Sequence, residues 1–114
     1  VPARDRVRAS LLVYLDHIGE RSTGWAAPFL HAGNDPDPAA EVRRQARGAS
    51  VGRLRALLQP SVAPRHDYAL PGFFGFLDGA CLEWVRRGCP EHDRHPLVEA
   101  ALGALEGALG DWGG

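Results

Sequence analysis

The stretch GFFGFLDGACLEWV, residues 72–85, carries the strongest apolar pattern in this sequence. Its apolar side chains recur at intervals of three and four residues along one stripe: Phe73, Phe76, Leu77, Ala80, Cys81, Trp84 and Val85. That spacing is the period of an α-helix with one face against a core. Gly88 and Pro90 predict the end of this helix, because glycine favours the C-terminal cap and proline cannot continue a helix.

The segments on either side of this stretch predict two more helices. A final helix begins near Pro96 and carries a long apolar series: Leu97, Val98, Ala101, Leu102, Leu105, Ala108, Leu109 and Trp112. An opening helix follows Pro2 with its own stripe: Val7, Leu11, Tyr14, Leu15 and Ile18. A linker over residues 60–64 separates the central stretch from what precedes it.

Two helices are predicted between the opening helix and that linker. A short one starts at Ser22 or Thr23 and includes Trp25 and Phe29, although Pro28 falls inside it. After the turn-forming residues 31–38, Asp37 and Pro38 can begin a longer helix that Pro60 ends. Its apolar positions are Val42, Ala46, Ala49, Leu54, Leu57 and Leu58, and its polar face is rich in arginine: Arg43, Arg44, Arg47, Arg53 and Arg55.

Composition and pattern together predict one all-α domain over residues 1–114, a bundle of about five helices. Strand-like alternation is absent, and Val, Ile and Thr never cluster. The net charge of −1 argues against a nucleic-acid-binding surface, which needs an excess of positive charge. No stretch is long and apolar enough to span a membrane, and the N-terminus lacks a signal-peptide pattern. Cys81 and Cys89 are too far apart on a helix for a disulfide, so we expect a cytoplasmic protein.

Glycines line two predicted helices at helical spacing. Gly72, Gly75 and Gly79 share a stripe of the central helix, and Gly103, Gly107 and Gly110 share a stripe of the last. A glycine inside a helix costs about 1 kcal/mol relative to alanine, so another interaction must offset these positions. Close packing of two helices can do so, because a missing side chain lets backbones approach. The partner helix can lie in the same chain or in a second copy of it.

Aromatic residues from three predicted helices can converge on an apolar space. The central helix offers rings on one side, the opening helix offers Tyr14 and His17, and the short helix offers Trp25 and Phe29. Such a space with a few polar tips resembles a small-molecule pocket. The alternative is that these rings simply fill the core of a small bundle.

The sequence contains no pattern that indicates an enzyme active site. Glycines occur at helical spacing rather than in a phosphate-binding loop, and the serines lack the context of an activated nucleophile. Cys81 lies on an apolar helix face, where burial makes a thiol inert. Cys89, His92 and His95 are zinc-compatible ligand types, but their spacing is no known structural zinc pattern. We therefore expect neither catalysis nor a cofactor, and a metal site at these three residues is kept as an alternative.

The sequence resembles the C-terminal domain of TetR-family transcriptional regulators. Residues 72–85 are similar to the penultimate helix of that family, residues 97–109 to its final helix, and residues 7–18 to the first long helix of its sensing domain. The resemblance implies a homodimer in which the last two helices of each subunit form a four-helix interface. It also implies that a small apolar effector relieves DNA binding by an N-terminal helix-turn-helix, for which residues 1–114 have no counterpart.

The resemblance assigns two groups of residues. Ligand contacts are expected from Tyr14, His17, Trp25, Phe29, Phe73, Phe76, Leu77 and Trp84. Dimer contacts are expected from Phe74, Gly75, Asp78, Leu82, Leu97, Ala101, Ala104, Leu105 and Ala108. Two other functions remain open: a helical protein-interaction module without a ligand cavity, and a metal-binding helical domain that uses Cys89, His92 and His95.

Overall fold

The computed structural model describes residues 2–30, 39–58 and 63–110. These residues form five α-helices and a short 3₁₀ turn, and no strand occurs among them: α1 (Ala3–Glu20), α2 (Ser22–Leu30), α3 (Ala40–Leu57), α4 (Pro64–Arg86), η1 (Glu91–Asp93) and α5 (Arg94–Leu109). The predicted all-helical bundle of about five helices is confirmed. No described helix is long and apolar enough to cross a membrane.

The helix boundaries differ from the sequence-based expectation at several points. α4 begins at Pro64 and runs through Pro71, so part of the predicted linker is helical. Pro64 lies in the first turn, where a missing N–H costs nothing. At the other end α4 stops at Arg86, and Gly88 takes the left-handed φ of 86° expected for the residue that ends a helix. The start of α3 that was predicted at residues 37–38, and Trp112, lie outside the described residues.

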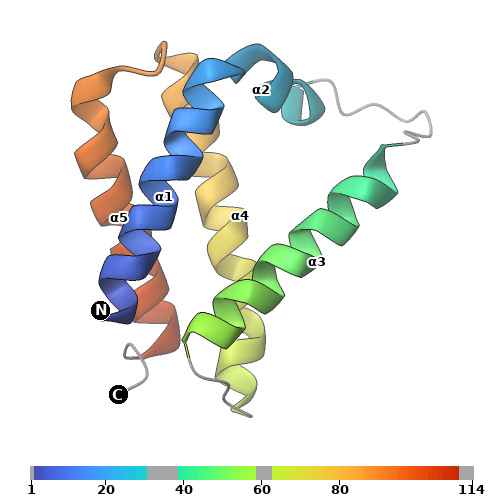
Figure 1. The fold of residues 1–114 in the computed structure, drawn as a ribbon, viewed down its shortest axis with the longest axis vertical. Coiled ribbons are helices and arrows are strands. Elements are labelled where there is room, and N and C mark those ends of the chain that lie inside the picture. The colour runs from blue at the N-terminus through green and yellow to red at the C-terminus, as the bar shows by residue number, and fades with distance from the viewer. Residues whose placement is uncertain (1, 31–38, 59–62, 111–114) are drawn as a thin grey trace.

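The helices form two layers, which explains the flat shape of 41 × 35 × 19 Å. α4 and α5 run antiparallel as one layer, and α1 lies across them in the other (Figure 1). α3 slants away beside α1 on that same side, and α2 closes the end of the bundle near the α4–α5 connection (Figure 1). α1 and α3 therefore cover one face of the α4–α5 pair and leave its opposite face, called here the outer face, uncovered by the described helices.

The core lies between α1, α4 and α5. Its most completely buried side chains come from these three helices: Leu15, Ile18, Leu70, Cys81, Val98, Leu102 and Leu105. α5 is the most deeply enclosed, because four of its residues within two turns, Val98, Ala101, Leu102 and Leu105, are at most 1% exposed. Burial of such side chains supplies most of the stability of a bundle of this size.

α3 is attached much less firmly than the other long helices. None of its 18 residues is buried: Val51, Leu54 and Leu57 pack half-buried against the core, and only the following residue, Leu58, is buried in it. Two ion pairs join it to α4: Arg47 Nη2 lies 2.8 Å from Asp78 Oδ1, and Arg55 Nη2 lies 3.1 Å from Asp67 Oδ1. Partly exposed pairs of this kind contribute about 0–1 kcal/mol each, so we expect α3 to be the least stable element of the described fold.

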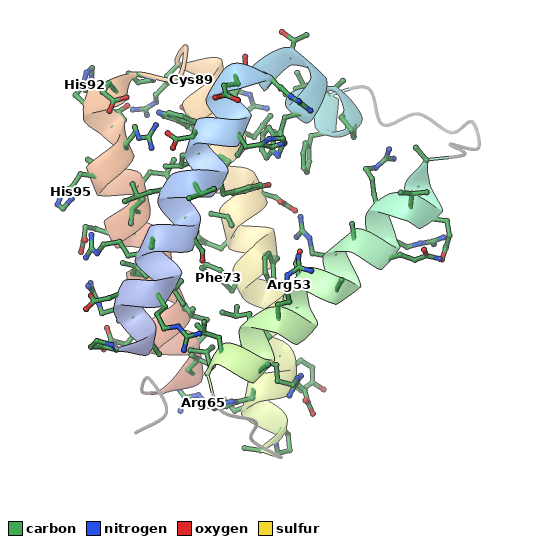
Figure 2. All side chains as sticks on the ribbon, viewed as in Figure 1. Arg53, Arg65, Phe73, Cys89, His92 and His95 are labelled. Carbon is green, nitrogen blue, oxygen red and sulfur yellow. The ribbon has the colours of Figure 1, made fainter. Side chains whose placement is uncertain are left out.

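Arginines also fix both ends of α5. The guanidinium of Arg65 donates to the carbonyls of Ala108 (2.8 Å) and Gly107 (2.9 Å), which are among the unpaired carbonyls at the end of a helix (Figure 2). At the start of α5, Arg94 donates to the carbonyl of Leu12 (3.2 Å) and pairs with Asp16 (2.8 Å). These contacts set the position of α5 along α4 and α1.

Glu99 on α5 lies opposite two arginines of α1, Arg8 and Arg4, and pairs with both. The hydrogen bond and charge of Arg8, with those of Arg4 beside it, hold the pKa of Glu99 below its ordinary value. A carboxyl group whose pKa is lowered in the folded state stabilises the fold above its unfolded pKa, and this contribution is lost as the pH falls through the folded pKa.

The buried stripe of α5 generates a first prediction. Leu102 is 0% exposed, whereas Leu12 on α1 is 38% exposed. We expect Leu102→Ala to lower the free energy of unfolding by about 2–5 kcal/mol, because it removes buried methyl groups and leaves a cavity. Leu12→Ala is the matched control and should cost much less. Urea unfolding followed by circular dichroism measures both, and equal losses would contradict this assignment of the core.

A second prediction concerns pH. Glu99→Gln should lower the midpoint of thermal unfolding at neutral pH, because two arginines lose their shared carboxylate. The difference from the wild type should shrink as the pH falls below the usual range of a glutamate, where the wild-type carboxyl group also becomes neutral. Melting curves between neutral and acidic pH provide the measurement. A gap that stays constant with pH would mean that the ion pairs contribute nothing.

Candidate ligand-binding site

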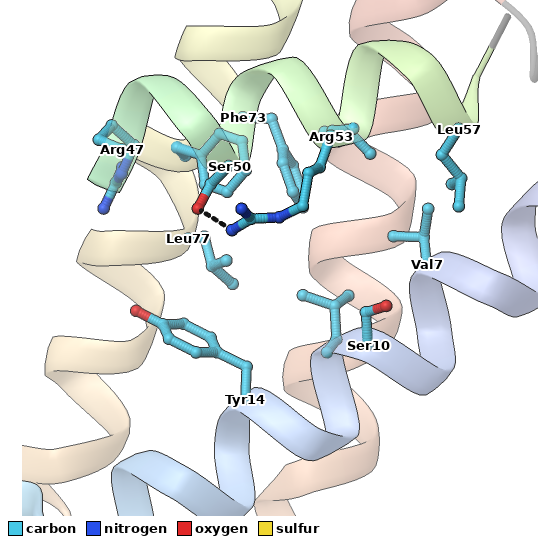
Figure 3. Close-up of a pocket in the computed structure, with 12 residues that line it drawn as sticks. Val7, Ser10, Tyr14, Arg47, Ser50, Arg53, Leu57, Phe73 and Leu77 are labelled. Carbon is cyan, nitrogen blue, oxygen red and sulfur yellow. Dashed lines mark hydrogen bonds between the residues drawn. The ribbon is translucent and has the colours of Figure 1, made fainter. Parts of the chain in front are cut away.

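A cavity of about 450 Å³ lies between α1, α3 and α4 (Figure 3). This volume falls within the range of about 300–1,000 Å³ that is typical of small-molecule sites. Leu11 of α1 and Phe73 and Leu77 of α4 form an apolar floor, and each is at most 5% exposed. The remaining lining comes from the same helices and from α3: Val7, Ser10, Tyr14, Arg47, Ser50, Arg53, Leu54, Leu57 and Phe74.

The cavity lies where α3 meets the core through half-buried side chains only. Leu54 and Leu57 are only half-buried on α3, and they face the floor from the opposite side. Arg47 stands between α3 and α4, with its guanidinium carbon 5.0 Å from the ring centre of Phe74 and its Nη2 against Asp78. The long side chain of Arg47 thus occupies the place where an apolar contact between α3 and α4 would otherwise form.

The polar groups at the cavity are hydroxyls and guanidiniums. Ser50 donates to the carbonyl of Ala46 (3.1 Å) and accepts from Arg53 Nη2 (3.0 Å). Tyr14 accepts a hydrogen bond from Trp25 Nε1 at 2.9 Å. Burial raises the pKa of Tyr14, so its hydroxyl stays protonated near neutral pH and remains able to donate a hydrogen bond.

A second, wider hollow of about 810 Å³ adjoins the first on the side of α2. The two share Tyr14, Arg47 and Ser50 as lining residues. The second hollow is framed by Trp25 and Phe29, whose ring centres lie 4.9 Å apart, and by exposed arginines of α3. Because none of its lining residues is buried, we regard the first cavity as the binding site and the second as its mouth toward α2.

The eight predicted ligand contacts do not form one set. Tyr14, Phe73 and Leu77 line the first cavity, and His17, Trp25 and Phe29 line the second hollow with Tyr14. Phe76 and Trp84 line neither. Phe76 is 41% exposed on the outer face, because three residues fall short of a full helical turn from Phe73. Trp84 is 3% exposed in the core, and its indole N–H donates to the carbonyl of Pro90 at 2.9 Å.

The residues that sequence reasoning missed come mainly from α3 and from the start of α1. Ser10, Arg47, Ser50 and Arg53 supply polar groups, and Val7, Leu11, Leu54 and Leu57 supply apolar surface. Their apolar positions were visible as part of helical stripes. No signal in the sequence indicated that α3 stands off from α4 or that two of its arginines face a cavity.

The nine predicted dimer contacts also divide. Ala101 and Leu105 are 0% exposed inside this single chain, so packing within the chain accounts for them. Phe74 and Asp78 face Arg47 of α3. The other five are exposed or half-buried on α4 and α5: Gly75, Leu82, Leu97, Ala104 and Ala108. Only these five are accessible on the surface of the single chain without a described contact to α3.

The helical glycines have no packing role in the described part of the chain. A Cβ atom added to Gly72, Gly75, Gly79, Gly103 or Gly107 would meet no other atom within 4 Å. Close packing between α4 and α5 therefore does not explain these residues. Gly110 differs, because it follows the last residue of α5 with φ 94° and lies against the guanidinium of Arg65.

The three candidate metal ligands are not gathered around a common point. Within the described residues, which include Cys89, His92 and His95, no group of three His, Cys, Asp or Glu side chains is placed to hold a metal ion. Figure 2 shows that the three side chains are spread along the α4–α5 connection and the first turn of α5, and that His95 points outward. The side chain of His92 is 85% exposed and lies 3.4 Å from Asp93.

Comparison of the chain with protein-family models, with curated proteins and with solved structures finds no match.

The surroundings of Cys81 generate a third prediction. Burial, with the nearby negative charge of Asp78, raises the pKa of Cys81 to about 12, so the thiol stays protonated and covered. We expect Ellman's reagent to label only the half-buried Cys89 in the native protein, and to label both thiols after unfolding. Cys89→Ala should abolish the native reaction and Cys81→Ala should leave it unchanged. Fast labelling of Cys81 in folded protein would contradict the described core.

Proposed function

We propose that this chain is the effector-sensing and dimerising domain of a TetR-type transcriptional repressor that acts in the cytoplasm. The observation that carries the proposal is the cavity of about 450 Å³ beside a well-packed core, because its volume and its apolar floor with a few polar groups are typical of small-molecule sites. The resemblance of residues 7–18, 72–85 and 97–109 to helices of that family is the second support. In such a repressor a helix-turn-helix binds the DNA, and the described residues do not contain one.

The outer face of the α4–α5 pair supports a dimer. The outer face carries these uncharged residues of α4 and α5, which are exposed or half-buried: Tyr68, Gly72, Gly75, Phe76, Gly79, Leu82, Leu97, Ala100, Ala104, Gly107 and Ala108. An apolar surface that the chain itself leaves uncovered often marks an interface. Two copies that meet through this face would form a four-helix contact, and the glycines would let the helices approach closely.

The mechanism of such a sensor is a shift in population. A ligand can change the equilibrium between two conformations only by its difference in affinity for them. α3 is the element suited to change, because it has no buried residue and contributes five of the twelve residues that line the cavity. A ligand held between α3 and the α1–α4 floor would fix α3 against the bundle. In a longer protein, the resulting change would pass through α1 to the DNA-binding head.

A helical interaction module without a ligand is the competing function, and the uncovered outer face also favours it. The two functions differ in the cavity. A sensor binds small apolar molecules there, whereas an interaction module uses the outer face alone. The two tests that follow address these features separately.

The dimer is tested by placing a charge on the outer face. Gly79→Arg should convert the dimer into a folded monomer, because the side chain has free space in the single chain but would be buried between two copies. Replacing a helical glycine also favours the helix by roughly 0.5–1 kcal/mol, so unfolding is not expected to confuse the result. Gly52→Arg on α3 is the matched control, since that glycine also lies in open space. Light scattering measures the molar mass of each protein. A monomeric wild type would contradict the proposed dimer.

The cavity is tested with the neutral fluorescent probe N-phenylnaphthylamine. We expect one probe to bind each wild-type chain with enhanced emission, and Leu54→Trp to weaken binding by at least about tenfold because the indole fills the space. Leu12→Trp, which lies outside the cavity, serves as the control. Absence of probe binding by the wild type, or equal binding by Leu54→Trp, would remove the basis of the sensor and leave the interaction module.

A further inference from the structure

The electrostatics of the cavity are one-sided. Two arginines, Arg47 and Arg53, are among the twelve described residues that line it, and no aspartate or glutamate is. The charge of Arg47 is matched by Asp78, which lies 2.8 Å away on α4. Arg53 differs: within the described part of the chain, its guanidinium contacts the neutral hydroxyl of Ser50 at 3.0 Å, and no carboxylate lies within ion-pair distance. The site therefore contains one positive charge without a counter-charge.

The uncompensated charge has a defined place in the cavity. In Figure 3, Arg53 reaches along α3 toward Ser50, above the space that separates α3 from Tyr14 and Ser10 of α1. The apolar floor lies on the other side of that space. The cavity thus has an apolar part, formed by α1 and α4, and a polar rim at Arg53 with hydroxyl groups beside it.

We infer, on the basis of the proposed sensing function, that the effector is an apolar carboxylic acid. Its carboxylate would accept hydrogen bonds from the guanidinium of Arg53, and its hydrocarbon part would lie on Leu11, Phe73 and Leu77. A guanidinium is suited to this role because its planar set of donors matches the two oxygens of a carboxylate. An aliphatic and an aromatic acid share this chemistry.

Other ligand classes fit the charges less well. An amine would place its positive charge beside two guanidiniums in a partly enclosed site, where like charges repel. A neutral hydrocarbon or alcohol would cover the floor but leave Arg53 without a counter-ion. A phosphate carries more charge than one free guanidinium can balance. The carboxylate matches both the charge and the apolar floor.

A bound carboxylic acid would also hold α3 in place. Arg53 belongs to the weakly attached helix, whereas the floor belongs to the well-packed helices α1 and α4. A carboxylic acid bound as described would connect the two, since its head contacts α3 and its body contacts the core side. A neutral ligand could occupy the floor without holding α3 through Arg53.

The experiment compares three probes of equal chain length: octanoate, octanol and octylamine. Each is titrated against bound N-phenylnaphthylamine at neutral pH and low salt. We expect octanoate to displace the probe at concentrations on the order of fivefold to tenfold lower than octanol, and octylamine to be the weakest. The preference for octanoate over octanol should shrink as salt is added, because Arg53 is exposed at the rim of the cavity.

Two variants locate the effect. Arg53→Gln should reduce the affinity for octanoate to that for octanol and leave the affinity for octanol unchanged. Arg86→Gln also removes one arginine charge, outside the cavity, and should retain the preference, since Arg86 pairs with Glu83 within α4 on the surface. A preference that survives in Arg53→Gln, or equal displacement by octanoate and octanol in the wild type, would overturn the inference.

The outcomes separate this inference from the function on which it rests. If N-phenylnaphthylamine binds and Leu54→Trp abolishes that binding, the cavity is a site whatever the preference among the three probes. A preference for octylamine would then contradict only the inference that the effector is a carboxylic acid. If the wild type binds neither the fluorescent probe nor octanoate, as measured directly by calorimetry, the sensing function itself fails.

Discussion

The described structure depends on the burial of one stripe of α5 between α1 and α4. Val98, Ala101, Leu102 and Leu105 are enclosed almost completely, and their small or branched side chains let the three helices pack at close range. Arg65 and Arg94 then hold the ends of α5 through backbone carbonyls of α5 and α1. α4 buries its own stripe in the same core, including Leu70, Phe73 and Leu77, and this burial fixes its rotation and the direction of its other faces.

That fixed rotation gives α4 three different surroundings. Its core side carries Phe73 and Leu77, the side toward α3 carries Phe74 and Asp78, and the third side carries glycines that meet no neighbour in the described chain. The cavity arises on the second side because an arginine, rather than an apolar side chain, stands between α3 and α4. The proposed dimer would use the third side. Ligand and partner would therefore contact opposite faces of the same helix.

Much of the fold could be predicted from the sequence, but little of the site could. Helix number and type follow from apolar spacing, but spacing did not separate core from surface on α5: Ala101 and Leu105 were assigned to an interface, and the structure encloses both within the chain. The prediction grouped Phe76 and Trp84 with Phe73 because all lie on one broad stripe. The structure separates them, since one edge of the stripe faces outward, the middle faces the core, and one end meets the α4–α5 connection.

The sequence by itself determined that the described chain forms helices and where each has its apolar side, because these properties depend on residues three or four positions apart. Only the tertiary structure decided how far α3 stands from α4, and hence that Arg53 and Ser50 face Tyr14 across a cavity. The reason is physical. α3 buries no side chain, so its position results from a few contacts with residues distant in sequence, such as Asp67 and Asp78, which no local pattern encodes.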